Sequence, residues 1–261
     1  MAGKVAFVLG SFDHAPLIVN RLDFKVNIDG SACGVGLSLL EEGAHERGDV
    51  ETVFDLIEAR RRDRGDGVVV LDIGANVGTH TVAWARSMEE WGGVIAIEAQ
   101  ERIFYALCGN IALNNCFNAR AIWAVAGRRS GAVATPVLDH RSPANFGGLS
   151  LLPTIKQDPG QLVDFSPPAM VGVPALRIDD LNLRRCDLIK VDVEGMEGEV
   201  LDGARSTIDR CRPLVYAEVS TCGADAITSR LSGYRMQPGG MNILAMPEED
   251  PIWGRLRVVG E

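Results

Sequence analysis

From Gly67 onward, short apolar segments alternate along the chain with segments of helical pattern. Strands that are apolar throughout are buried on both faces, as in parallel sheets, and their alternation with helices is typical of a doubly wound α/β domain. The expected elements are strands at 68–73, 94–97, 121–126, 188–193 and 214–219 and helices at 79–91, 102–114 and 198–211. Two further strands, 234–237 and 242–246, flank Pro238-Gly239-Gly240 as a hairpin. The sequence therefore predicts a mostly parallel, seven-stranded α/β sheet, doubly wound by helices, that ends in an antiparallel hairpin.

Two segments lie outside this alternation. Residues 1–48 lack it, and we expect an N-terminal extension that acts as a lid or as a contact in a homodimer. The main domain is expected to span 49–261 and to begin with a helix over 49–64, which Asp49 would cap. Residues 128–174 are rich in Pro, Gly, Ser and Asn and interrupt the alternation. Insertions of this length are usually lids or binding segments, and a disordered insertion is the alternative.

The charge balance and the apolar pattern exclude several classes of protein. Lysine and arginine number 26 against 35 aspartates and glutamates, a net charge of −9, so a nucleic-acid partner is not expected. No apolar run approaches the roughly 18 residues of a transmembrane helix, and Val5–Leu9 is too short for the core of a signal peptide. We therefore expect no membrane insertion and a cytoplasmic location. The six cysteines show no CxxC spacing, which favours free thiols over a zinc site.

The first strand of the alternation leads into a loop with the spacing D-x-G-x-x-x-G. Glycine allows a sharp turn and a close approach to a ligand, and the following helix offers free N–H groups. The loop has neither the G-x-G-x-x-G of dinucleotide folds nor the lysine of a phosphate loop. An acidic residue facing the ligand suits the amine and sulfonium of S-adenosylmethionine better than a pyrophosphate. A glycine turn without a ligand is the alternative. The candidate cofactor-binding residues are Asp72, Gly74, Asn76, Gly78 and Thr79.

The ends of the next two strands fit the nucleoside part of such a cofactor. Glu98 ends the second strand, where a carboxylate can accept hydrogen bonds from both ribose hydroxyls. Small residues close the third strand, and Ala126, together with Ala99 beside Glu98, would leave room for an adenine ring. Taken alone, small residues at a strand end are more often plain packing.

The fourth strand carries a dense group of ionisable residues, Lys190, Asp192 and Glu194. Strand alternation places the three on one face, at the carboxyl end where ligands of doubly wound sheets bind. Buried charges are costly unless they are paired or used, so an ion pair of Lys190 with one of the carboxylates is the alternative to an active-site floor. Two carboxylates also suit Mg²⁺, but no third acidic ligand is apparent, so a metal site is the less favoured account.

Four segments of the chain resemble the FkbM-type methyltransferases, a branch of the class I enzymes that use S-adenosylmethionine. They are Val70–Thr81 (VLDIGANVGTHT), Ile97–Asn115 (IEAQERIFYALCGNIALNN), Arg177–Ala204 (RIDDLNLRRCDLIKVDVEGMEGEVLDGA) and Asn242–Pro247 (NILAMP). The likeness spans roughly residues 50–247, and one departure is Ala99-Gln100, where many relatives have a proline. The resemblance implies a Rossmann-like fold, methyl transfer from S-adenosylmethionine, and cofactor binding by the Asp72 loop and Glu98.

The insertion contains Asn145–Ser150 (NFGGLS), which is similar to a segment of the same family and is interpreted as a flap over cofactor and acceptor. Asn145, Ser150 and the preceding His140 are the candidates for contact with the acceptor. The expected activity is O-methylation of a sugar, a glycan or a secondary metabolite, with Asp192 or Glu194 as the base and Lys190 orienting it. The alternatives are a protein that binds the cofactor without turnover and, with less support, a nicotinamide oxidoreductase, which the absent G-x-G-x-x-G disfavours.

Overall fold

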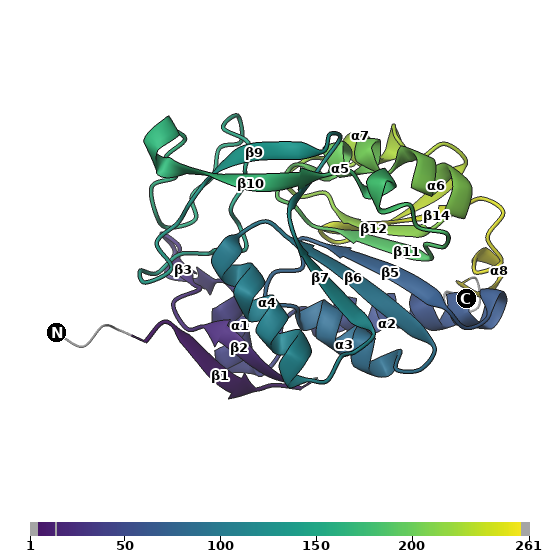
Figure 1. The fold of residues 1–261 in the computed structure, drawn as a ribbon, viewed down its shortest axis with the longest axis horizontal. Coiled ribbons are helices and arrows are strands. Elements are labelled where there is room, and N and C mark those ends of the chain that lie inside the picture. Colours follow the sequence, from purple (N-terminus) through teal and green to yellow (C-terminus); the bar gives the residue numbers. More distant parts are fainter. Residues whose placement is uncertain (1–4, 14, 257–261) are drawn as a thin grey trace.

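A seven-stranded sheet forms the centre of the molecule (Figure 1). The computed structural model describes residues 5–13 and 15–256, and the strand order is β13-β14-β12-β11-β5-β6-β7. Strands β7, β6, β5, β11 and β12 are parallel, and β14 runs antiparallel to both β12 and β13. The predicted doubly wound sheet with a closing antiparallel hairpin is confirmed. The strand bounds are β5 Val68–Ile73, β6 Gly92–Glu98, β7 Ala119–Trp123, β11 Leu188–Val191, β12 Leu214–Glu218, β13 Tyr234–Gly239 and β14 Asn242–Pro247.

Helices cover both faces of the sheet, and each face has its own apolar core. Val68 and Val70 of β5 lie in the core that includes α2 (Arg47–Arg64), α3 (Thr79–Ser87) and α4 (Glu101–Leu113). Leu71 and Ile73 lie in the opposite core, with α5 (Glu197–Gly203), α6 (Arg205–Cys211) and α7 (Asp225–Thr228). Alternate residues of a strand point to opposite faces, so a strand that is apolar at nearly every position is buried on both sides.

Two expected strands end earlier than the apolar pattern indicates. The segment 121–126 leaves the main sheet after Trp123, because Val125–Ala126 (β8) pair instead with β10 (Met170–Leu176). The segment 188–193 is a strand only to Val191. In the closing hairpin, Pro238 and Gly239 belong to β13, and the turn lies at Gly240 and Met241.

Two expected helices are shorter or divided. The helix expected over 79–91 ends at Ser87, after which Glu90 takes a left-handed φ of 70° and the chain turns into β6. The segment 198–211 forms two helices because a carboxylate oxygen of Asp179 accepts the N–H of Thr207 at 2.8 Å and starts α6 separately.

The start of α2 also differs from expectation. Glu46, with φ 49°, occupies the N-cap position, so Asp49 does not cap this helix. Asp49 instead accepts a hydrogen bond from the hydroxyl of Tyr216 at 2.8 Å.

The described part of residues 1–48 packs into the same core as the main domain. It forms β1 (Phe7–Ser11), β2 (Pro16–Asn20), β3 (Lys25–Val26), β4 (Ala32–Cys33) and α1 (Val35–Glu42). Figure 1 shows the β1–β2 hairpin, in purple, beside α4. The side chain of Asn110 on α4 accepts the N–H of Ile18 at 2.6 Å and donates to its carbonyl oxygen at 3.0 Å. Residues 1–4 of the expected extension and 257–261 of the expected main domain lie outside the described residues.

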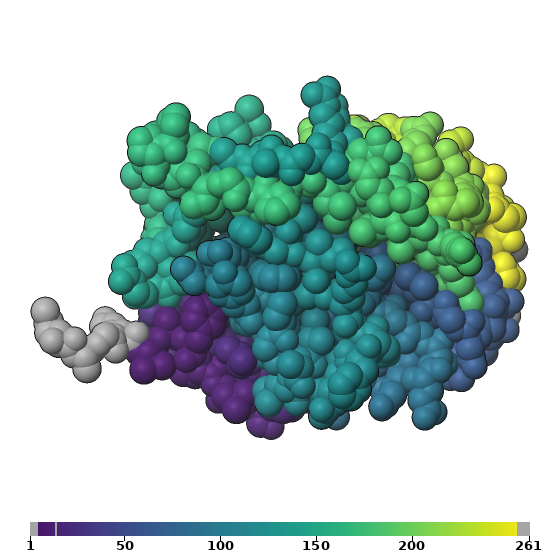
Figure 2. Space-filling model, viewed as in Figure 1, coloured from purple at the N-terminus to yellow at the C-terminus, as the bar shows by residue number. Residues whose placement is uncertain are grey.

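The insertion is built around a second, smaller sheet. Within it, β9 (Gly131–Pro136) pairs antiparallel with β10, and β8 pairs parallel with β10 on its other side. The connection from 137 to 169 contains no strand and one short 3-10 turn (Pro167–Ala169). Hydrogen bonds such as Asn145 N–H to the carbonyl oxygen of Pro159, at 2.8 Å, order this connection, against the alternative of a disordered insertion. Figure 2 shows the insertion, in teal and green, standing above the sheet domain.

The remaining elements are short, namely a 3-10 turn at Ile178–Leu181 and α8 at Trp253–Leu256. Among the described residues, none of the helices combines the length and the apolar character that crossing a bilayer requires.

Candidate functional site

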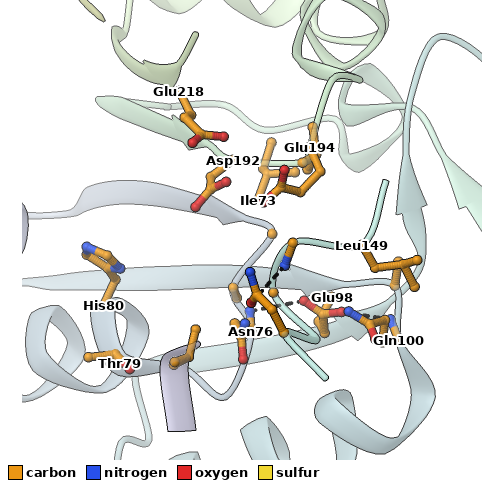
Figure 3. Close-up of a pocket in the computed structure, with 18 of the residues that line it drawn as sticks. Ile73, Asn76, Thr79, His80, Glu98, Gln100, Leu149, Asp192, Glu194 and Glu218 are labelled. Carbon is orange, nitrogen blue, oxygen red and sulfur yellow. Dashed lines mark hydrogen bonds between the residues drawn. The ribbon is translucent and has the colours of Figure 1, made fainter. Parts of the chain in front are cut away.

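A cavity of about 360 Å³ opens at the carboxyl edge of the sheet, beside β5, β6, β11 and β12. The chain order reverses between β5 and β11, which is where open α/β sheets bind ligands. The inner wall of the cavity comes from the ends of the strands and the loops after them. The rest of its lining includes two segments outside the sheet, 32–38 and 145–149, which we call the outer wall. Figure 3 shows Asp192, Glu194 and Glu218 on one side of the cavity and Asn76, Glu98 and Gln100 on the other.

The loop after β5 passes very close to the loop after β11. A Cβ atom at Gly74, where φ is 78°, would lie 1.8 Å from the carbonyl oxygen of Asp192, so only glycine fits. Gly74, Asn76 and Thr79 line the cavity, as the cofactor prediction requires. Gly78 does not line it. A Cβ atom there would lie 2.6 Å from Leu107, so this glycine serves the packing of the loop on α4.

Asp72 lies beneath the cavity, and the expectation that it faces a ligand is wrong. Its side chain is fully buried and accepts a hydrogen bond from the hydroxyl of Thr81 at 2.5 Å. Its other oxygen lies 3.7 Å from Nζ of Lys190. Because Asp72 is still part of β5, strand alternation directs it to the face that α3 covers. Asp72 therefore helps to hold Lys190 in place.

Glu98 reaches the cavity from the end of β6. Its two carboxylate oxygens accept the N–H of Asn76 at 3.0 Å and the N–H of Gln100 at 2.7 Å. Burial raises the pKa of Glu98 to about 7, although these hydrogen bonds act in the opposite direction. A carboxylate has about four lone-pair positions, so Glu98 can accept further bonds from a ligand. Ala99 and Ala126 line the cavity near it, as the prediction of an adenine site requires.

Three carboxylates meet on the opposite side of the cavity. Ligand oxygens of Asp192, Glu194 and Glu218 all lie within 4.8 Å of one another, a spacing that suits a divalent cation. Lys190 Nζ lies 3.2 Å from an oxygen of Asp192 and 3.2 Å from the carbonyl oxygen of Gly74. Burial alone would lower the pKa of Lys190, but the nearby Asp192, Asp72 and Glu46 raise it overall. This lysine therefore stays charged among acidic groups.

Glu194 is held in a strained turn and not on the strand. Its φ is 53°, and its neighbour Gly195 has φ 103°. Glu197, which is fully buried, fixes this turn because its carboxylate accepts the N–H of Val193 at 3.0 Å and of Gly195 at 3.1 Å. Burial and the proximity of Asp192 raise the pKa of Glu194 to about 8, so it carries a proton at neutral pH.

Two histidines and a glutamate extend the polar side of the cavity. His80 Nε2 and His45 Nε2 each lie 3.7 Å from the carboxylate of Glu46. Burial lowers the pKa of His45 to about 4 and raises the pKa of Glu46 to about 7. His80 also packs on Trp84, with ring centroids 5.0 Å apart. His80 thus lies at the cavity, and two residues from the first 48, His45 and Glu46, join it.

The candidate acceptor contacts are only partly brought together. Asn145 lines the cavity, but Ser150 and His140 do not. Ser150 is buried, and its backbone is tied to the side chain of Gln157 by two hydrogen bonds of 2.8 Å. His140 packs on Phe146, with centroids 4.3 Å apart, and burial lowers its pKa to about 4. Both residues contribute to the packing and bonding of the insertion, and neither lines the cavity.

Glu218, His45 and Glu46 were missed by sequence reasoning. Glu218 had a usable signal, because it lies near the end of the fifth strand and parallel strands end at one edge of a sheet. Glu218 is also the third acidic residue beside Asp192 and Glu194, and the lack of such a residue was the reason to disfavour a metal site. His45 and Glu46 had no such signal, since their approach to the cavity depends on how the N-terminal segment packs.

Comparison with known proteins gives one family match and a set of structural similarities. A family model described as "Methyltransferase FkbM domain" matches residues 72–236, more than half of the chain. The sequence has no significant match among curated proteins. The crystal structure of methyltransferase FkbM from Methylobacillus flagellatus KT is 17% identical, with a TM-score of 0.46. The similarity covers 69% of this chain and 43% of that one.

Two other solved structures are similar at comparable levels. A crystal structure of WbdD is 10% identical, with a TM-score of 0.50, over 82% of this chain and 43% of its own. Precorrin-6y C5,15-methyltransferase from Geobacter metallireducens GS-15 is 13% identical, with a TM-score of 0.44, over 78% of this chain and 92% of its own. At 10% identity the likeness to WbdD concerns the fold alone.

Proposed function

Because the chain belongs to the FkbM methyltransferase family, we propose that it transfers a methyl group from S-adenosylmethionine to a hydroxyl oxygen. The acceptor class that we propose is a sugar, a glycan or a secondary metabolite. The observation that carries the proposal is the pairing, in one cavity, of Glu98 on one side with the Asp192–Glu194–Glu218 cluster on the other.

The inner wall offers a fitting place for the cofactor. Glu98 would accept hydrogen bonds from the ribose hydroxyls, and Ala99 with Ala126 would border the adenine. Gly74, Asn76 and Thr79 would adjoin the methionine part, near the N-terminus of α3. The cavity volume lies within the range of roughly 300–1,000 Å³ of small-molecule sites. When bound, S-adenosylmethionine supplies an electrophilic methyl group.

The acidic cluster supplies the groups that the acceptor needs. Asp192, paired with Lys190, would accept the proton that the hydroxyl loses as its oxygen forms the bond to the methyl carbon. Glu194, protonated at neutral pH, would donate a hydrogen bond that orients the acceptor. The walls of the cavity would hold cofactor and acceptor in line, and such positioning can lower a barrier by roughly 7–11 kcal/mol.

A metal-assisted reaction is the competing account, and the three-carboxylate cluster is the observation that favours it. In that case Asp192, Glu194 and Glu218 would hold Mg²⁺, and the ion would lower the pKa of the acceptor hydroxyl. Treatment with EDTA separates the two accounts. Activity that is lost and then restored by added Mg²⁺ would assign the cluster to a metal, and unchanged activity would leave Asp192 as the base.

The proposal is tested by comparing glycans, lipids and small metabolites from cells with and without the gene by mass spectrometry. A product heavier by one CH₂ unit, present only with the gene, is expected. The purified protein should then form S-adenosylhomocysteine with that acceptor. Binding of S-adenosylhomocysteine without any turnover on the candidate acceptors would favour the alternative of a cofactor-binding protein. Failure to bind it at all would contradict the proposed function.

A further inference from the structure

Asp23 is a buried carboxylate outside the residues that line the cavity. It follows β2, and 2% of its surface is exposed. One oxygen accepts the N–H of Phe146 at 2.9 Å, and the other accepts the N–H of Gly36 at 3.1 Å. Among the ion pairs of the described residues, none involves Asp23. Its charge is thus met by two main-chain N–H groups that lie 110 residues apart in the sequence, since 146 − 36 = 110.

The two donors belong to the two segments of the outer wall. Gly36 follows Gly34 and Val35, and Phe146 lies between Asn145 and Gly147, all four of which line the cavity. The side chain of Phe146 is fully buried, so only its neighbours face the ligand space. Asp23 therefore ties the two lining segments to one another at a point directly behind the wall.

Main-chain hydrogen bonds continue the same connection. The N–H of Ala144 donates to the carbonyl oxygen of Leu22 at 3.1 Å, and the N–H of Leu37 donates to that of Asp23 at 3.1 Å. The side chain of Gln100, on the inner wall, donates to the carbonyl oxygen of Phe146 at 2.7 Å. Residues 22–23 thus join the two segments of the outer wall to each other, and Gln100 joins the outer wall to the inner wall.

A carboxylate is the side chain that this arrangement requires. Asparagine has one acceptor oxygen, so at position 23 it would leave either Gly36 N–H or Phe146 N–H without its partner. A lost hydrogen bond to a charged group is worth more than a neutral one, and a buried donor left unpaired adds to the cost. Burial raises the pKa of Asp23 to about 6, which shows how much desolvation opposes this carboxylate.

We propose that Asp23 is a positioning residue that holds both segments of the outer wall against the cavity and so sets the affinity for its ligands. The proposal rests on the proposed function in one respect, because the ligand used to test it is S-adenosylhomocysteine. Asp23 touches no ligand, and its effect passes through Gly36 and Phe146.

The test compares amide hydrogen exchange of the wild-type chain, Asp23→Asn and a control, Asp29→Asn. Asp29 lies in the same N-terminal segment, is exposed, and bonds with Ser31. In Asp23→Asn without ligand, exchange should become faster at 34–38 and at 145–149 together, while β5 and β11 keep their protection. Calorimetry should show an affinity for S-adenosylhomocysteine that is lower by about tenfold or more. With an acceptor, KM should rise while kcat at saturation stays near the wild-type value.

Unchanged exchange and affinity in Asp23→Asn would overturn the proposal, and so would faster exchange across the whole sheet, since that marks a residue of the general core. If the variant does not fold, residue-resolved exchange of the wild-type chain gives the answer. The N–H groups of Gly36 and Phe146 should then open with one common rate, and independent opening would overturn the proposal. A wild-type chain that binds no S-adenosylhomocysteine would instead contradict the proposed function, while the exchange experiment would still decide the role of Asp23.

Discussion

The ammonium nitrogen of Lys190 lies 3.2 Å from a carboxylate oxygen of Asp192, the first residue after the end of β11. Lys190 is itself held by the carbonyl oxygen of Gly74 and by Asp72. Asp192 is therefore fixed by a cation that two other neighbours position, while its side chain stays partly accessible from the cavity. This arrangement suits a residue that receives a proton from a bound acceptor.

Replacing Asp192 by asparagine keeps the shape of the side chain and removes the base. We expect kcat to fall by about 10²–10⁴, the usual contribution of general acid–base catalysis, while the affinity for S-adenosylhomocysteine stays nearly constant. Steady-state kinetics and calorimetry measure the two quantities. Asp209→Asn, at an exposed position of α6, is the matched control and should keep the wild-type rate. A rate close to wild type in Asp192→Asn would remove Asp192 from the mechanism.

The raised pKa of Glu194 predicts a pH dependence of stability. The pKa is about 8 in the folded protein against an ordinary value of 4.5, so between these pH values the folded state binds more protons than the unfolded state. The free energy of unfolding should therefore fall as the pH rises through this window, by at most about 1.4 kcal/mol per pH unit for one group. Glu194→Gln should remove this part of the slope. Denaturant titrations at several pH values test it, and identical slopes in both proteins would show that Glu194 is not the titrating group.

Glu98→Gln should weaken binding of the cofactor product. The amide has one acceptor oxygen where Glu98 has two, so either the N–H of Asn76 or the N–H of Gln100 loses its partner. A ribose hydroxyl would then compete with the remaining N–H group for the single oxygen. We expect the affinity for S-adenosylhomocysteine to fall by about tenfold or more in calorimetry. Glu89→Gln, at an exposed position outside the cavity, should bind like the wild type. Equal affinity in the Glu98 variant would argue against a ribose site at this position.

Gly74→Ala should destabilise the fold far more than an alanine at another glycine of left-handed conformation. The added Cβ atom would lie 1.8 Å from the carbonyl oxygen of Asp192, so the loops after β5 and β11 would have to separate. Gly240 has φ 62° and open space around it, so Gly240→Ala carries the conformational cost alone, about 1–2 kcal/mol. We expect Gly74→Ala to lose about 1–3 kcal/mol more. Chemical denaturation of both variants measures the difference, and equal losses would show that the loops separate without cost.

The sheet and most residues of the cavity's inner wall were predictable from the sequence. The apolar strand 68–73 is predictable because it is buried on two faces, and the glycine at position 74 is predictable because the chain makes a tight turn there. Asp192 follows from the same reasoning, since it comes directly after a central strand. Depth is harder to infer. Asp72 pairs with Lys190 in the sheet and therefore lies two residues deeper than Asp192, which places it under α3 and out of the cavity.

The outer wall was not predictable in the same way. Its contacts join residues 23 and 146, and no periodicity or spacing in the sequence connects positions so far apart. Ser150 and His140 looked like ligand contacts because polar residues in a long insertion often serve that purpose. Their side chains instead meet the needs of the insertion itself, one by bonding within the loop and one by packing on Phe146.

The outer wall is fastened through its own main-chain groups, namely N–H donors, which every residue except proline has, and carbonyl acceptors, which every residue has. Its path therefore does not depend on the side chain of Ala32, which lines the cavity from an exposed position. Asn145 and Leu149 differ, because Oδ1 of Asn145 accepts the N–H of Gly148 at 3.2 Å and Leu149 is buried in the core. In an evolving lineage, such a frame allows an exposed lining side chain to change while the backbone keeps its path. For enzyme engineering, position 32 is accordingly the place to randomise, whereas positions 23, 145 and 149 are ones to leave alone.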